Sequence, residues 1–238
     1  MNELVGNISY MQMVILNATG RLVEKKLADW FEASFICMSW PDPRIWCNGI
    51  GALMGDTNSS VVAGTVAGVL ASESKVYGGS LTNIAGVEFI REALRLSSEG
   101  HSIEDIIQRC PIRNERPMVI GYVRPVKGKD ERILPMKKIA ADLGFIQGPH
   151  IELANEISTF LEAQYGEGMN ILGYVSAFAA DNEFSGEELY SIRAVIVSSG
   201  VTACYLNTIS KEPGSYLPTR CEDIDFYGPE DRELKELD

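Results

Sequence analysis

The segment from residue 111 to residue 128 combines cationic side chains with three prolines and two glycines, which interrupt helices. Arginine side chains can bind planar anions, and Arg124 in particular can hold a carboxylate or a phosphate through two parallel hydrogen bonds. The alternative for Arg124 is an ordinary solvated charge, because basic residues are common in exposed loops. The segment is therefore the strongest candidate in the chain for a hinge or an anion-binding loop.

Tyr77 is a second side chain that can do chemistry. It lies in a turn before Gly78 and Gly79, between two runs of residues typical of helices. A phenol can donate a hydrogen bond to a carbonyl or enolate oxygen, as tyrosines do in oxyanion holes. The alternative, with equal weight, is an aromatic side chain that fills the core.

Other reactive side chains are few. The five cysteines are Cys37, Cys47, Cys110, Cys204 and Cys221. An odd number without a CxxC pair favours reduced thiols in a cytoplasmic protein over disulfides or a zinc site. Cys204 is interpreted as a small buried hydrophobe, because no histidine in a motif is placed to activate it. No metal site is expected.

Composition narrows the class of partner. The 238 residues carry a formal net charge of −12. Nucleic acids and anionic membranes are disfavoured, because contacts with phosphates need a concentrated basic face. Acidic small molecules remain compatible with a local arginine cluster. No basic segment followed by an apolar run opens the chain, so no signal peptide is expected, and the apolar stretch at residues 61–71 is too short to cross a bilayer.

The elements that must position these residues are predicted to be helices almost throughout. The expected helices span residues 9–18, 22–38, 44–54, 59–74, 79–98, 102–109, 131–144, 149–165, 170–182 and 185–207. Ser102, Pro149 and Ser185 are typical of helix starts. The small residues of helix 59–74 predict a face that another helix backbone approaches closely, within a buried core.

Two stretches with candidate chemistry resemble the citrate synthase superfamily. Residues 67–80 resemble the segment in which a catalytic histidine precedes a Gly-Gly pair, and Tyr77 stands at that histidine. Residues 118–132 resemble a loop with a second catalytic histidine and an Asp-Pro-Arg triplet. Arg124 stands at this histidine, and Arg132 stands at the arginine.

Further stretches extend the resemblance over most of the chain. Residues 6–22 resemble the family's entry segment, 185–204 a helix that ends in a histidine, here Cys204, and 226–232 the C-terminal tail. The family's catalytic aspartate should fall near residues 170–173, where this chain has no acid. The order of these motifs implies the mostly α, multi-helical fold of the family.

The resemblance implies a set of site residues. It implies catalytic positions at Tyr77 and Arg124, substrate-binding positions at Arg132, Tyr122, Gly78, Gly79 and Arg220, and CoA-phosphate positions at Arg113, Arg116 and Lys127. A solvated basic loop is the alternative for the last three. No covalently bound cofactor is expected, and CoA or another acyl thioester would be a substrate.

Two functions from different classes follow. Loss of a general base alone typically costs about 10²–10⁴-fold in rate, so a chain without all three catalytic groups should not be an ordinary citrate synthase. The first hypothesis is a divergent acyltransferase or lyase that forms or cleaves a C–C bond between an acyl thioester and a carboxylic acid. The second is a non-catalytic relative that binds a metabolite or a partner subunit.

The resemblance also implies an organisation. Residues 1–111 and 196–238 are expected to form a large helical domain, and residues 112–195 a smaller one with the candidate ligand-binding loop. Family members dimerise through helices that correspond to residues 44–97, so a homodimer is implied.

Overall fold

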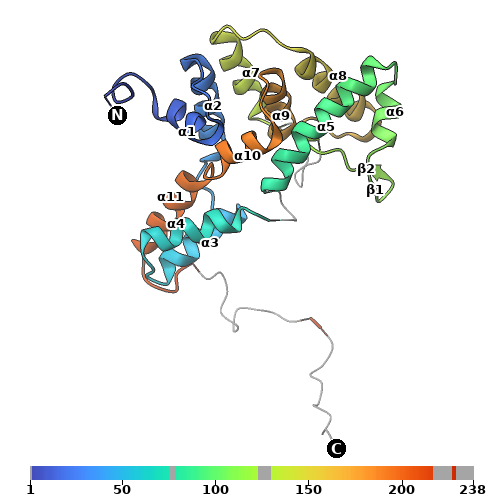
Figure 1. Cartoon of the computed structure of the whole chain (residues 1–238). Helices are drawn as coiled ribbons and strands as arrows, with labels where there is room; N and C mark the ends of the chain where they lie inside the picture. Colours follow the sequence, from blue (N-terminus) through green and yellow to red (C-terminus); the bar gives the residue numbers. More distant parts are fainter. Residues whose placement is uncertain (1, 75–78, 123–129, 217–226, 229–238) are drawn as a thin grey trace, which may run out of the picture.

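Helices are the main elements of the computed structural model, which describes residues 2–74, 79–122, 130–216 and 227–228 (Figure 1). The helices are α1 (Tyr10–Thr19), α2 (Lys25–Met38), α3 (Trp46–Asp56), α4 (Val61–Ala71), α5 (Ser80–Ser98), α6 (Ile103–Gln108), α7 (Ile133–Asp142), α8 (Pro149–Tyr165), α9 (Ile171–Asp181), α10 (Gly186–Arg193) and α11 (Ser198–Ile209). One antiparallel hairpin pairs β1 (Ile112–Arg113) with β2 (Arg116–Pro117). The predicted mostly α fold is confirmed.

Several helix starts follow the capping signals in the sequence. Ser102 and Asp105 form a capping box at the start of α6, and Ser185 and Glu188 form another at α10. Pro149 lies in the first turn of α8, where its missing N–H costs no intrahelical hydrogen bond. These signals fix where α8 and α10 begin, and both helices border the candidate site.

The larger of two hydrophobic clusters among the described residues joins α2 to α5, α8, α9 and α10. The ring of Trp30 in α2 stacks on Phe178 in α9, with 3.5 Å between ring centroids. Phe31 meets Phe184 edge to face, with centroids 5.3 Å apart. These four side chains are buried, and large aromatic side chains dominate core energetics. The stack thus sets the position of α2 relative to α9.

The smaller cluster is built where α3, α4 and α11 pack together. Figure 1 shows these three helices as a group below the others. A Cβ atom on Gly68 of α4 would lie only 2.8 Å from the carbonyl oxygen of Cys47, and it would overlap the side chain of Val201. Glycine therefore allows the close approach of helices that the small-residue face predicts, and this prediction is confirmed.

The opposite face of α4 differs from the expected buried helix. Val62 and Leu70 are each 69% exposed, and Val66 is 51% exposed. The small residues bury one side of α4, whereas its larger apolar residues point away from α3 and α11. In the single chain this apolar face is open.

The predicted helix at residues 185–207 is interrupted between Arg193 and Ser198. Ile192 packs in the larger cluster, whereas Ile196 and Val197 pack in the smaller one, so the turn carries the chain from one cluster to the other. The stretch Gly186–Ile209 is long and apolar enough to cross a membrane by length and composition alone. Half of the most apolar 18-residue part of this stretch is buried inside the protein, and core helices of soluble proteins meet the same criteria of length and composition.

Hydrophobic packing crosses the predicted domain boundary at residue 112. Helix α5 packs mainly on α8, α9 and α10, and α2 packs on α7. The clusters therefore group the helices differently from the predicted domains. The division into a large domain of residues 1–111 and 196–238 and a smaller domain of residues 112–195 remains a prediction.

Candidate active site

The segment predicted to bind ligands is fixed at one end to the start of α9. The carbonyl oxygen of Gly121 accepts a hydrogen bond of 2.8 Å from the amide of Asn170. Gly121 has a φ of +87°, and a Cβ atom there would lie 2.6 Å from the Cα of Gly173. A Cβ atom on Gly173 would lie 2.5 Å from the oxygen of Gly121. This backbone contact therefore requires glycine on both sides.

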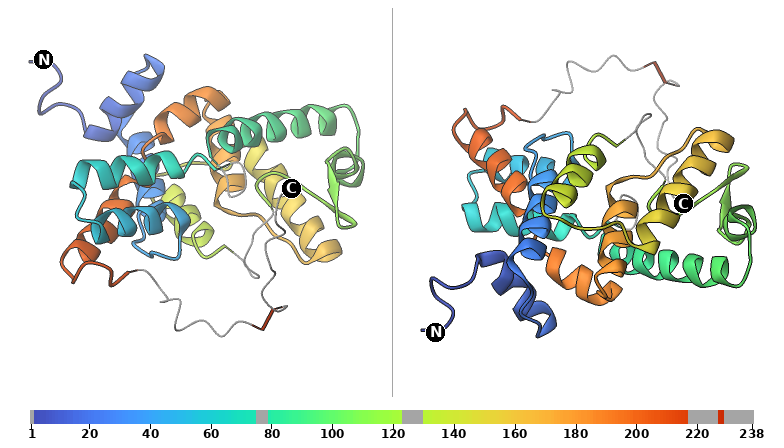
Figure 2. Two further views of the ribbon diagram at one scale, coloured as in Figure 1. Left: turned by 90° about the horizontal axis from the view of Figure 1, so that it is seen from below. Right: turned by 90° about the horizontal axis from the view of Figure 1, so that it is seen from above.

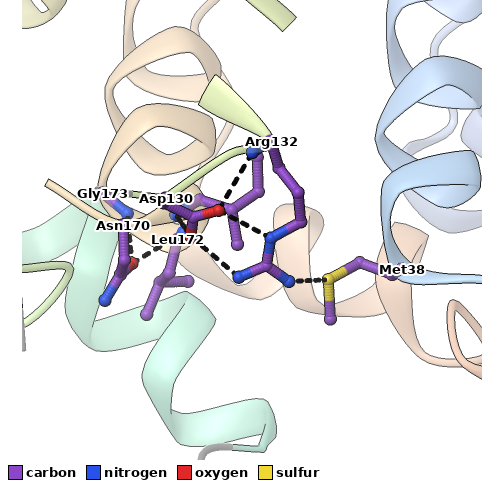
Figure 3. Close-up of polar contacts among 7 residues, drawn as sticks. Met38, Asp130, Arg132, Asn170, Leu172 and Gly173 are labelled. Atoms are coloured by element: carbon purple, nitrogen blue, oxygen red, sulfur yellow. Dashed lines mark hydrogen bonds and ion pairs between the residues drawn. The ribbon is translucent and has the colours of Figure 1, made fainter. Parts of the chain in front are cut away.

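Asp130 fixes the other end of the segment to the same place (Figure 3). Its Oδ2 atom accepts a hydrogen bond of 2.8 Å from the amide of Ile171, the first residue of α9. Its two carboxylate oxygens also accept hydrogen bonds of 2.8 Å each from Nε and Nη2 of Arg132. A carboxylate is favoured at a helix N-terminus, where backbone amides point outward. Both ends of the interval 123–129 are thus anchored beside α9.

The pKa of Asp130 follows from these contacts. Its side chain is fully buried, and burial alone would raise the pKa. The hydrogen bonds and positive charge of Arg132, together with the amide of Ile171, outweigh burial and hold the pKa below its usual value. An efficient general base has a pKa near the working pH, so Asp130 is suited to anchoring rather than to proton abstraction.

Arg132 keeps one nitrogen directed away from Asp130. Its Nη1 atom lies 3.3 Å from the Sδ atom of Met38 at the end of α2, and Figure 3 shows the guanidinium between the two residues. The side chain is 27% exposed. A thioether is a weak acceptor, whereas a carboxylate oxygen would form a stronger, charge-assisted bond. Nη1 is therefore available to an incoming anion.

The start of α9 carries an amide where the family resemblance expects a catalytic acid. The Oδ1 atom of Asn170 accepts hydrogen bonds from the amides of Leu172 and Gly173, over 2.9 and 3.2 Å. The side chain of Asn170 thus caps the helix. Among the described residues, the carboxylate that contacts the start of α9 is that of Asp130.

Arg193 in the last turn of α10 is a candidate residue that sequence reasoning missed. It is only 6% exposed, and its Nε and Nη1 atoms are buried with no hydrogen-bond partner in the described structure. Burial, and next the positive charge of Arg132, lower its pKa to about 10. A perturbed, buried ionisable group is a signal of function. A basic residue in the last turn of a helix is explained by the helix dipole alone, so the burial of Arg193 could not be read from residue types and spacing.

Cys37 near the end of α2 is within electrostatic range of the two arginines. Burial raises the pKa of its thiol, and the charges of Arg132 and Arg193 oppose this rise without cancelling it. The thiol therefore stays protonated near neutral pH, and nothing here activates it as a nucleophile.

Tyr122 lies in the core rather than in an open cavity. It is 2% exposed, and its hydroxyl donates a hydrogen bond of 3.1 Å to the carbonyl oxygen of Ala154 in α8. Burial raises the pKa of its phenol. In this structure Tyr122 connects the segment predicted to bind ligands to α8, which favours a positioning role over direct contact with substrate.

Gly79 is the described residue of the predicted Gly-Gly pair. Its carbonyl oxygen accepts a hydrogen bond of 2.6 Å from the hydroxyl of Thr82, in the first turn of α5. A Cβ atom on Gly79 would lie 3.1 Å from the Cα of Glu73, so the backbone passes close by. Tyr77, Gly78, Arg124, Lys127 and Arg220 lie outside the described residues, and their roles remain predictions.

Arg113 and Arg116 are not brought beside Arg132. Both are exposed and belong to the β1–β2 hairpin, where they line a shallow depression with Glu167. Figures 1 and 2 place this hairpin at the end of the molecule opposite to α1 and α2. Nη1 of Arg116 lies 3.5 Å from the carboxylate of Glu167. Within the part of the chain that the structure describes, no cluster of three or more metal-ligating side chains occurs.

Comparison with known proteins supplies the fold family. No protein-family model and no curated protein matches the chain. Among solved structures, it is similar to citryl-CoA lyase from Hydrogenobacter thermophilus, with a TM-score of 0.78 and 25% identity, over 98% of this chain and 89% of that one.

Two further structures are more distant in sequence. ATP citrate lyase from Methanothrix soehngenii, in complex with citrate and coenzyme A, gives a TM-score of 0.72 at 14% identity, and the match covers 96% of this chain but 38% of that one. Citrate synthase from Thermotoga maritima MSB8 gives a TM-score of 0.66 at 18% identity, and the match covers 96% of this chain and 60% of that one. The predicted family resemblance is confirmed at the level of the fold: the chain has the fold of the citrate synthase superfamily.

Proposed function

We propose that this protein is a citrate synthase-like enzyme that forms or cleaves a C–C bond between an acyl thioester and a carboxylic acid. The similar structures include a citryl-CoA lyase and an ATP citrate lyase bound to citrate and coenzyme A. An acyl-CoA and a small acidic metabolite are accordingly the proposed substrates. The working form is a cytoplasmic homodimer.

One observation carries the proposal. Asp130 joins the amide at the start of α9 to the guanidinium of Arg132. This contact holds Arg132 next to the start of α9, where the family resemblance places the catalytic aspartate. Nη1 of Arg132 remains able to donate a hydrogen bond to a ligand. A rigid arginine beside a helix N-terminus is suited to a carboxylate.

The proposed roles keep the residues suggested by the sequence. Tyr77 and Arg124 stabilise negative charge on the reacting oxygen, in place of the family's histidines. Arg132 binds the acid, with support from Gly78, Gly79, Tyr122 and Arg220. Arg113, Arg116 and Lys127 bind the phosphates of CoA.

This chemistry would not be that of an ordinary citrate synthase. Residues 170–173 supply no carboxylate, and the pKa of Asp130 is lowered. Proton abstraction from an acyl-CoA methyl group therefore lacks a suitable base among the described residues. Addition of another acyl group and cleavage of a citryl-type thioester both move a proton at the same carbon, so the proposed enzyme would need a different proton-transfer group from that of an ordinary citrate synthase.

A ligand screen followed by turnover assays tests the proposal. We expect CoA, acyl-CoAs and di- or tricarboxylic acids to raise the melting temperature, because a ligand that binds the native state stabilises it by mass action. CoA release from acetyl-CoA and oxaloacetate should stay far below ordinary enzymatic rates of about 1–10³ s⁻¹. A protein that none of these ligands stabilises, and that turns none of them over, would refute the proposal.

A non-catalytic relative is the second candidate, and the engagement of Asp130 favours it. The described carboxylate at the start of α9 is committed to Arg132 and Ile171. A binding protein would respond to the same ligands in the thermal screen but would convert none of them.

A further inference from the structure

A cavity of about 470 Å³ lies where the segment between α2 and α3 meets the C-terminal half of α11. Its volume is within the range of pockets that hold small molecules, about 300–1,000 Å³. None of the described residues that line it belongs to the candidate active site. Figure 1 shows α11 with α3 and α4, apart from α9. The cavity is therefore a separate feature of the fold.

The part of the wall that contains Pro41 and Pro43 is held in place by α3. Proline fixes its own φ and restricts the residue before it. Nδ2 of Asn48 donates hydrogen bonds of 2.9 and 3.2 Å to the carbonyl oxygens of Trp40 and Asp42, the residues before the two prolines. Asn48 is only 2% exposed. A wall formed before binding lowers the entropy that a ligand must overcome.

Tyr216 forms another part of the wall and is also anchored. Its amide donates a hydrogen bond of 3.1 Å to Oδ1 of Asp56, and its hydroxyl donates one of 3.4 Å to the carbonyl oxygen of Pro43. Asp56 is 5% exposed, so a buried carboxylate positions this side of the cavity. The chain after α11 is thereby joined to the proline segment, and the cavity is enclosed by contacts between distant parts of the sequence.

The charge on the cavity wall has one sign. Among the described lining residues, Lys211 carries a positive charge and none carries a negative charge. The nearby carboxylate of Asp42 is bound to Arg44, with 3.0 Å from Nε to Oδ1 and 2.6 Å from Nη2 to Oδ2. Asn207, in the last turn of α11, adds a side-chain amide to the lining. The wall thus offers one cation and further hydrogen-bond donors to a ligand.

The inner part of the wall is apolar. Cys204 is 4% exposed, and burial raises the pKa of its thiol, so it contributes an uncharged surface beside the proline rings. Free cysteine behaves as a small hydrophobe in such a setting. A pocket of this composition combines a polar mouth with apolar contacts, as small-molecule sites do.

We propose that this cavity binds a small carboxylic acid with one negative charge and an apolar body. Its carboxylate accepts hydrogen bonds from Lys211 and from the amide of Asn207, and its apolar body contacts Pro41, Pro43 and Cys204. One charge matches the single lysine, whereas a second would be repelled by a protein with a net charge of −12. This site goes beyond the proposed function and does not depend on it.

A titration with benzoate, followed by the chemical shifts of the full-length protein, tests the proposal. Benzamide is the neutral comparator of almost the same shape. We expect both ligands to shift the signals of the Asn207 side-chain amide and the Lys211 backbone amide. Benzoate should bind the wild type about fivefold more tightly than benzamide, as expected for an ion pair near the surface.

Lys211→Met separates the charge from the shape of the site. Because Lys211 is exposed, the variant should melt at the temperature of the wild type. It should bind benzoate and benzamide equally, since the ion pair is lost and the apolar contacts remain. Lys138→Met, which removes an exposed lysine from α7, is the matched control and should keep the preference for benzoate.

Three outcomes overturn the inference. If benzoate at millimolar concentration shifts neither the Asn207 nor the Lys211 signal, the cavity does not bind monocarboxylates. If Lys211→Met still prefers benzoate by fivefold, Lys211 does not hold the carboxylate. If benzoate shifts the signals of Asn170 and Leu172 instead, it binds at the start of α9, and the second site is refuted while the proposed function stands.

Discussion

Asp130 holds Arg132 through two hydrogen bonds of 2.8 Å, from Nε and Nη2 of the guanidinium. Because Asp130 also accepts the first amide of α9, the orientation of Arg132 is coupled to the position of that helix. A change at Asp130 should therefore affect stability and acid binding together.

Asp130→Asn should destabilise the protein by about 3 kcal/mol, because it leaves Arg132 and Arg193 without a compensating charge in a buried cluster. Urea denaturation should show a lower midpoint with an unchanged slope. Asp29→Asn, which breaks the exposed pair of Asp29 with Lys25, is the control and should cost at most about 0.5 kcal/mol. Equal effects of the two changes would show that the Asp130 pair is worth no more than a surface pair.

The stabilisation from Asp130 should depend on pH in a defined direction. The folded state lowers the pKa of Asp130, so the stabilisation is fully present above the unfolded value of about 3.9. It is lost as the pH falls through the lower folded-state value. The difference in unfolding free energy between wild type and Asp130→Asn should be constant from about pH 8 to 5 and shrink below about 4. A difference that grew on acidification would contradict this assignment.

Gly121→Ala should destabilise the protein more than Gly144→Ala. Both glycines have positive φ, +87° and +76°, but a Cβ atom on Gly144 meets nothing within 4 Å. The control therefore carries only the backbone cost of about 1 kcal/mol. Gly121→Ala adds a clash with the backbone of Gly173, so the difference between the two unfolding free energies measures the backbone contact. Equal losses of unfolding free energy in the two variants would mean that the backbones of Gly121 and Gly173 can move apart without cost.

The exposed apolar face of α4 should be the core of a two-fold interface. Sedimentation should show a dimer of the wild type at micromolar concentration, because a buried interface of this kind favours self-association. Leu70→Glu should give a monomer. Leu134→Glu, at a 77% exposed position of α7, should remain a dimer. A monomeric wild type would refute the predicted homodimer.

The sequence was informative where local signals act alone. The caps at Ser102 and Ser185 and the small-residue face of α4 could be read from residue types and spacing, and the structure confirms them. The break after Arg193 was missed, because residues 185–207 have continuous helical character and only tertiary packing divides them between two clusters. The burial of Arg193 escaped notice for the same reason. The roles of Tyr77 and Arg124 remain predictions.

The smaller cluster joins segments made at very different times. The hydroxyls of Thr65 and Thr202 are 2.8 Å apart in space and 137 residues apart in sequence. At about 5–20 residues per second, α4 leaves the ribosome roughly 7–30 s before its partner α11 is made. During that interval the glycine face that α11 covers and the face with Val62 and Leu70 are both open. A nascent chain paused in this window displays its most apolar helix to chaperones and to neighbouring nascent copies.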